Sequence, residues 1–99
     1  MYKGTTPTLT LTLPTEIDLT GTQVYVTLGK SNGFPVITKT TEDLQIAKNV
    51  IEVFLTQEET LSLKDPTLLQ VNWTYGNGQR SCSNIVEIDI KKNLINEVL

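Results

Sequence analysis

The sequence contains no histidine, so the commonest general base and metal ligand of enzymes is missing from its 99 residues. This absence excludes Ser-His-Asp and Cys-His arrangements for nucleophilic catalysis. Glu87 and Asp89 lie two apart on one predicted strand face, about 7 Å by strand rise, which would suit acid–base work or calcium binding. We interpret them as solvated surface charges, because a raised-pKa acid needs a pocket and no Asp-x-Asp-x-Asp-Gly loop is present. We therefore predict no enzyme, no catalytic residue, no cofactor and no metal site.

Cysteine is almost as scarce, since Cys82 is alone and an internal disulfide is excluded. Cys82 shares strand parity with Val86, Ile88 and Ile90. We therefore predict that it points into the core and behaves as a small hydrophobe. A reactive thiol would need an electropositive partner that lowers its pKa.

Basic residues are also few, with seven lysines, one arginine and a net charge of −3. No basic stripe is present, so we expect no nucleic-acid partner. No apolar run approaches the roughly 20 residues that span a bilayer, so we expect no membrane partner. The start, Met1-Tyr2-Lys3-Gly4, has no apolar leader, which predicts a protein kept in a reducing cytoplasm. It would reach the outside only by lysis or as part of a particle.

The sequence is rich in aliphatic residues that alternate with polar ones. From Thr8 to Leu13, threonine and leucine alternate, which gives an extended segment one apolar face and one hydroxyl face. The same period of two, bounded by Gly, Asn and Pro turns, predicts seven strands. These are Thr6 to Leu13, Gln23 to Lys30, Phe34 to Thr41, Leu44 to Ala47, Val50 to Thr56, Thr67 to Tyr75 and Gln79 to Ile90.

Two segments carry helical signals instead. Thr56 and Glu59 fit a capping box, which predicts a short helical turn near residues 57–63. Four aliphatic residues spaced three and four apart predict a short helical tail over residues 93–99. Seven short strands with Trp73 in a central one predict an all-β, antiparallel β-sandwich over residues 1–92, with a small barrel as the alternative.

Several apolar residues fall on strand faces that should be polar in a sandwich, namely Tyr25, Val50, Phe54 and Ile85. A partner subunit could cover them, or the chain's own loops and tail could. A β-bulge that reverses the parity is the third explanation. Of these, Tyr25, Phe54 and Ile85 are our candidate interface residues.

The last seven residues hold the other candidates, Leu94, Ile95, Val98 and Leu99. A chain end is normally frayed and polar, whereas this one carries four aliphatic residues within six positions. We expect the tail to dock on this domain or on a neighbouring subunit, because burial stabilises each aliphatic side chain by about 1.5–3 kcal/mol.

Four stretches, taken in order, resemble one known family. Gly4 to Pro14 and Asp18 to Leu28 are similar to the N-terminal domain of bacteriophage baseplate upper proteins and related small prophage virion proteins of Gram-positive hosts. Leu55 to Leu61 and Arg80 to Ile90 resemble the middle and last strands of that domain. The resemblance implies an immunoglobulin-like sandwich that works as an oligomer and attaches a receptor-binding or fibre component to the virion.

The proteins it resembles continue into a segment that carries the receptor-binding protein, whereas this sequence ends at Leu99. We therefore expect a stand-alone, non-enzymatic structural subunit of the tail, baseplate or neck. Its partners would be other virion proteins and copies of itself, and its place the virion and, during assembly, the host cytoplasm. The alternatives are a capsid decoration or head-fibre attachment protein, or a carbohydrate- or surface-binding module that uses Tyr2, Phe34 and Tyr75.

Overall fold

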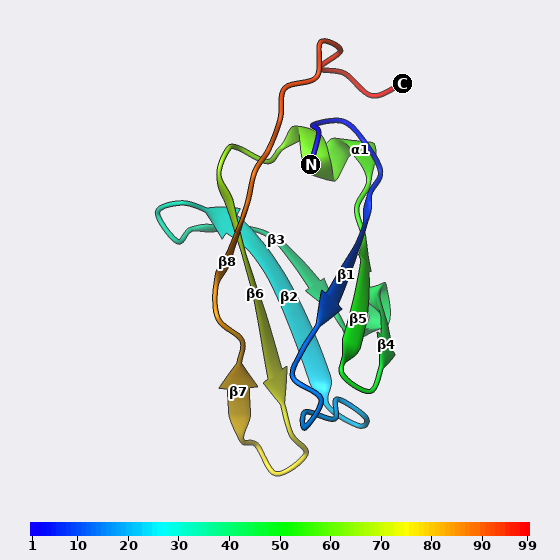
Figure 1. The fold of residues 1–99 in the computed structure, drawn as a ribbon, viewed down its shortest axis with the longest axis vertical. Helices are drawn as coiled ribbons and strands as arrows, with labels where there is room; N and C mark the ends of the chain where they lie inside the picture. The colour runs from blue at the N-terminus through cyan, green and yellow to red at the C-terminus, as the bar shows by residue number, and fades with distance from the viewer.

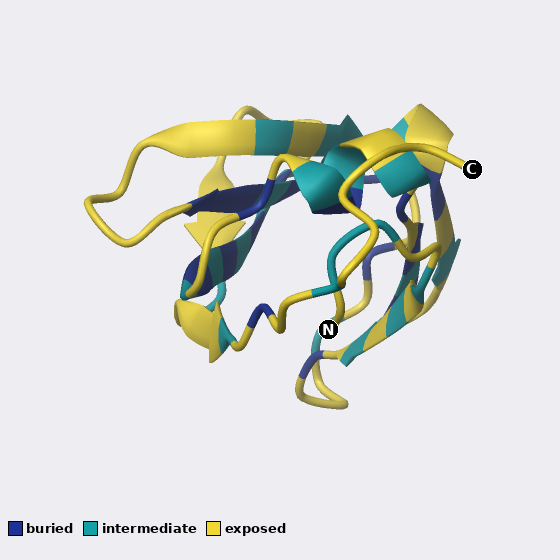
Figure 2. Ribbon diagram, turned by 90° about the horizontal axis from the view of Figure 1, so that it is seen from above, coloured by how far each residue is buried: buried dark blue, intermediate teal, exposed yellow.

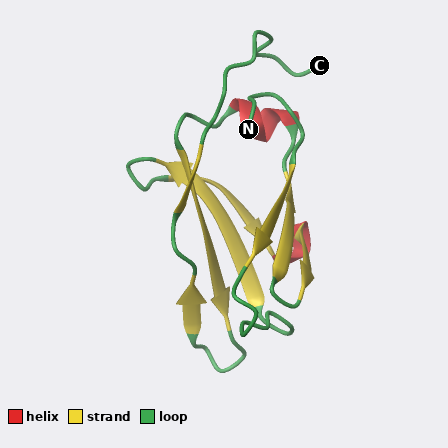
Figure 3. Cartoon of the chain, viewed as in Figure 1, coloured by secondary structure: helices red, strands yellow, loops and turns green.

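A computed structural model describes all of residues 1–99, and its regular secondary structure is mostly β-strand (Figures 1 and 3). The helical elements are the 3₁₀ turn η1 (Thr41–Asp43) and the short helix α1 (Gln57–Leu61). The strands are β1 (Thr8–Thr12), β2 (Gln23–Lys30), β3 (Pro35–Thr40), β4 (Leu44–Ala47), β5 (Val50–Phe54), β6 (Thr67–Thr74), β7 (Arg80–Cys82) and β8 (Val86–Ile88).

The strands form two antiparallel sheets that face each other, which confirms the predicted β-sandwich (Figure 2). The smaller sheet has the order β1-β5-β4. The larger has the order β3-β2-β6, and both β7 and β8 pair with the free side of β6. The chain passes from one sheet to the other through η1, where the Thr41 hydroxyl accepts a hydrogen bond from the Val24 N–H at 2.7 Å.

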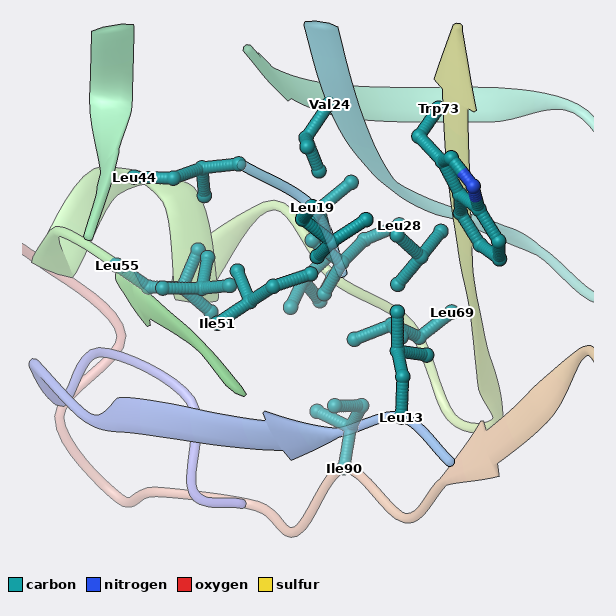
Figure 4. Close-up of a cluster of buried hydrophobic side chains, with 14 residues drawn as sticks. Leu13, Leu19, Val24, Leu28, Leu44, Ile51, Leu55, Leu69, Trp73 and Ile90 are labelled. Atoms are coloured by element: carbon teal, nitrogen blue, oxygen red, sulfur yellow. The ribbon is translucent and has the colours of Figure 1, made fainter. Parts of the chain in front are cut away.

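The core lies between the sheets, because alternate residues of each strand point inward. Strand β2 alternates exposed and buried residues along most of its length, and β6 alternates buried and half-buried ones. The fully inward side chains of Leu28, Ile51 and Val53 are 0% exposed, and Trp73 is 3% exposed. Figure 4 shows the side chains of both sheets and of the connecting loops meeting in one cluster.

The predicted helical turn is present as α1. The Thr56 hydroxyl accepts from the Glu59 N–H at 3.2 Å, and the Glu59 carboxylate accepts from the Thr56 N–H at 2.9 Å. This is the capping box that the sequence predicts, and it satisfies two of the N–H groups that a helix start leaves without partners. The helix ends at Leu61, two residues before the predicted end.

The predicted seventh strand is divided in two, and the inward orientation of Cys82 is wrong. Cys82 lies opposite Asn72, whereas Val86 lies opposite Leu69. Cys82 and Val86 are four residues apart, whereas their partners on β6, Asn72 and Leu69, are three apart. The one extra residue between β7 and β8 reverses the sheet face to which alternate side chains point. Cys82 consequently shares the outer face with Asn72 and is exposed.

The predicted helical tail is also wrong, because the structure has no helix after Leu61. A segment of seven residues is too short to hold a helix without extensive packing, since isolated helices below about 12–15 residues are marginal in water. In its place the backbone of Ile95 bonds to the Asn93 side chain at 3.2 Å, a local contact that competes with helix formation.

Candidate interaction surfaces

The two chain ends lie together at one end of the sandwich, beside α1 (Figure 1). Tyr2 and Lys91 form a parallel bridge, in which the Lys91 N–H donates to the Met1 carbonyl at 2.7 Å and the Lys3 N–H donates to the Lys91 carbonyl at 3.1 Å. The Met1 ammonium donates to the Asp89 carbonyl at 2.9 Å. The N-terminal segment therefore fixes where the chain leaves the sandwich.

The C-terminal segment, residues 93–99, is held to this end by polar contacts. The Asn93 amide donates to the Lys3 carbonyl at 3.0 Å. The Leu99 N–H donates to Gln57 Oε1 at 2.8 Å, and Gln57 Nε2 donates back to the Leu99 carbonyl at 3.4 Å. Gln57 is the first residue of α1, so the end of the chain is tied to the helix start.

These contacts leave the aliphatic side chains of the segment largely in water. Leu94 is 100% exposed and Leu99 is 85% exposed, while Ile95 and Val98 are about half exposed. Tyr2 is also more than half exposed, with Lys91 Nζ 5.5 Å from its ring centre. We call these five apolar residues the terminal patch. Exposed apolar residues at one end of a domain often mark an interaction site.

The other three predicted interface residues lie elsewhere. Phe54 ends β5 on the outer face of the smaller sheet, opposite Thr8, and is 43% exposed. Tyr25 and Ile85 lie on the larger sheet, where they line two neighbouring hollows. The hollows share Thr27 and Asn72, so they form one shallow depression. The structure thus divides the seven predicted residues among three surfaces.

The aromatic residues proposed for carbohydrate binding are exposed but do not form one platform. Phe34 lies in the β2–β3 turn, beyond the end of β2 that pairs with Thr67. Tyr75 follows the opposite end of β6, and its hydroxyl accepts from the Trp73 indole N–H at 3.0 Å. The two rings therefore lie at opposite ends of the larger sheet, and Tyr2 belongs to the terminal patch.

Sequence reasoning missed two exposed apolar residues. Val86 faces the same side as Leu69 yet is 55% exposed, because no strand covers that edge of the sandwich. Val36 on the edge strand β3 is 37% exposed. Exposure at a sheet edge depends on strand order, so no local signal could have revealed either residue.

One ion pair links the larger sheet to α1, since Lys39 Nζ lies 2.7 Å from Glu59 Oε2. Burial opposes ionisation of Glu59, but hydrogen bonds from Lys39 and the Thr56 N–H hold the pKa of its carboxyl below the ordinary 4.5. In the loop before β2, bonds from the Thr20 hydroxyl and N–H lower the pKa of Asp18. Both groups serve local structure.

No three His, Cys, Asp or Glu side chains come together in a group that could hold a metal ion. The helices of this chain are all too short and too polar to span a bilayer. The chain matches no family model, no curated protein and no solved structure. The resemblance to baseplate upper proteins therefore stays a prediction.

Proposed function

We propose that this protein is a non-enzymatic structural subunit of a bacteriophage particle, located in the tail, baseplate or neck. It would act by packing against copies of itself and against other virion proteins. Two features support this proposal: the ordered resemblance over most of the chain, and the surface that the sandwich leaves uncovered.

The terminal patch is the observation that carries the proposal. Four aliphatic side chains are displayed on a segment whose backbone is anchored to the domain at Lys3 and Gln57. An anchored apolar segment suits a fixed contact with a neighbouring subunit, because its geometry is set before the partner arrives. In a symmetric particle every copy would present the same patch.

The first experiment is quantitative mass spectrometry of purified phage particles from the source strain. Many copies of this chain per particle are expected. Abundant protein in the lysate together with its absence from intact particles would reject the proposal. The same particles can then be separated into heads and tails. The protein is expected in the tail fraction, whereas its presence in the head fraction would favour capsid decoration or head-fibre attachment.

A paired substitution tests the terminal patch itself. Leu94→Ser with Leu99→Ser should prevent incorporation into particles, because it removes the two most exposed apolar side chains of the segment. Since neither side chain is buried, the fold should persist. Phe34→Ser, which removes an exposed aromatic ring of the β2–β3 turn that is not part of the patch, is the matched control and should be incorporated normally.

A carbohydrate- or surface-binding module is the second candidate. The depression on the larger sheet supports it, because Tyr25, Asn72 and Arg80 line one part of it and could stack on or hydrogen-bond to a sugar. The guanidinium is already fixed by two bonds to Asn72 Oδ1, at 2.9 and 3.2 Å. Binding to a glycan array that Tyr25→Ala abolishes would favour this function over the structural one.

A further inference from the structure

Strand β1 has a free edge. The Leu13 N–H donates to the Asn49 carbonyl and the Leu55 N–H donates to the Pro7 carbonyl, so the odd-numbered residues of this segment bond to β5. In an antiparallel pair the backbone groups of alternate residues point to opposite sides. The N–H and C=O groups of Thr8, Thr10 and Thr12 therefore point away from β5, where β1 has no further strand.

The other free edges carry features that discourage pairing, and β1 does not. Strand β3 begins with Pro35, carries Lys39 and lies beside a register shift in β2. Strand β4 has four residues, and β7 and β8 have three each. The five residues of β1 include no charge and no proline, since Pro7 and Pro14 lie just outside the strand, and β1 pairs with β5 without a bulge. Natural proteins normally protect such edges, because an unprotected edge is a template for pairing with another chain.

The sequence of β1, Thr-Leu-Thr-Leu-Thr, reads the same in both directions. Two copies paired antiparallel about a two-fold axis at Thr10 would place Thr8 opposite Thr12 and Leu9 opposite Leu11. All three threonine pairs would then be of the hydrogen-bonded type, which gives about six new backbone hydrogen bonds. The leucines would meet on the inner face and the threonines on the outer face.

A hollow lies beside this edge, lined by the end of β1 together with Leu69, Ser83 and Val86. An added strand would extend the smaller sheet on that side, at about 4.8 Å from β1. Its inward leucines could cover Val86, which points inward but is 55% exposed.

We propose that β1 is a homodimerisation edge, at which a second copy of this chain adds its own β1 in antiparallel register about Thr10. The β1 contact would be one of the interfaces between copies of this chain in the particle, and this biological role rests on the proposed function. The two contacts are separate, because the terminal patch lies at the end of the sandwich and β1 lies along its side.

The test uses sedimentation velocity of the full chain over a concentration series. Thr10 is exposed and lies opposite Glu52 on β5, so Thr10→Glu would align four carboxylates across the dimer. Like charges directly opposite one another disfavour strand pairing. We expect the wild type to dimerise and Thr10→Glu to be a folded monomer by circular dichroism. Thr10→Gln, which has the same shape without the charge, should dimerise, as should Thr38→Glu on the edge of β3.

Hydrogen exchange gives an independent measurement on the wild-type chain. The amides of Thr8, Thr10 and Thr12 should exchange more slowly as the protein concentration rises, and Thr10→Glu should abolish that dependence. A wild type that is monomeric throughout, or Thr10→Glu and Thr10→Gln variants that behave alike, would overturn this proposal. A monomeric chain found in particles would remove only the β1 contact, whereas a dimer absent from particles would remove only the proposed function.

Discussion

Deletion of Leu94–Leu99 should leave the stability of the isolated domain almost unchanged and abolish its incorporation into particles. Only Ile95 and Val98 bury about half of their side chains, so they contribute roughly 1.5–3 kcal/mol together. Leu94 and Leu99 contribute little, since both are largely exposed. The conformational entropy lost when these six residues are ordered opposes this gain, so little net stabilisation remains.

We therefore expect the free energy of unfolding to change by less than about 1 kcal/mol, which corresponds to a shift in Tm below about 4–8 °C for a domain of this size. Differential scanning calorimetry of the full and shortened chains measures it directly. Asn93 stays in the shortened chain, so its bond to the Lys3 carbonyl is kept.

Ile90→Ala is the matched control, because Ile90 is 6% exposed and lies just before the tail. Replacing the buried Ile90 side chain by alanine should destabilise the domain by about 2–5 kcal/mol. If the shortened chain instead loses as much stability as Ile90→Ala, the tail is part of the core. The tail would then not be free to bind a partner.

Leu28→Ala should cost about 2–5 kcal/mol in urea denaturation, because Leu28 is 0% exposed between the sheets; a smaller loss would contradict the packing of the core. Glu59→Gln should cost no more than about 1 kcal/mol at neutral pH, because the Lys39–Glu59 pair lies near the surface, where solvent weakens it. Because folding lowers the pKa of Glu59, its ionised carboxylate stabilises the folded protein above the ordinary pKa of the group. This stabilisation is lost as the pH falls through the pKa of the folded state. The urea midpoints of the wild type and the variant should therefore converge in acid. Cys82 should react with a thiol reagent at similar rates in the native and the denatured protein, since it is exposed; strong native protection would show that it lies inside.

The sequence predicted the local elements well because their causes are local. The period of two in Gln23–Lys30 requires only that one strand face be buried, and the bounds of this strand agree with the prediction residue for residue. The capping box of Thr56 and Glu59 is a contact between residues three apart. Gly33 and Gly78 adopt positive φ in their turns, which their lack of a side chain permits.

Tertiary structure alone decided the orientation of Cys82 and the exposure of the candidate surfaces. The extra residue after Cys82 becomes visible only when that segment is counted against β6. The spacing of the last four aliphatic residues is helical, but side-chain bonds to Gln57 and Asn93 hold the segment in another form. The order of amino acids sets which residues are apolar and with what period they recur. Strand order, which depends on contacts between residues far apart in the chain, determined which of them are covered and left the edge of β1 and the terminal patch open.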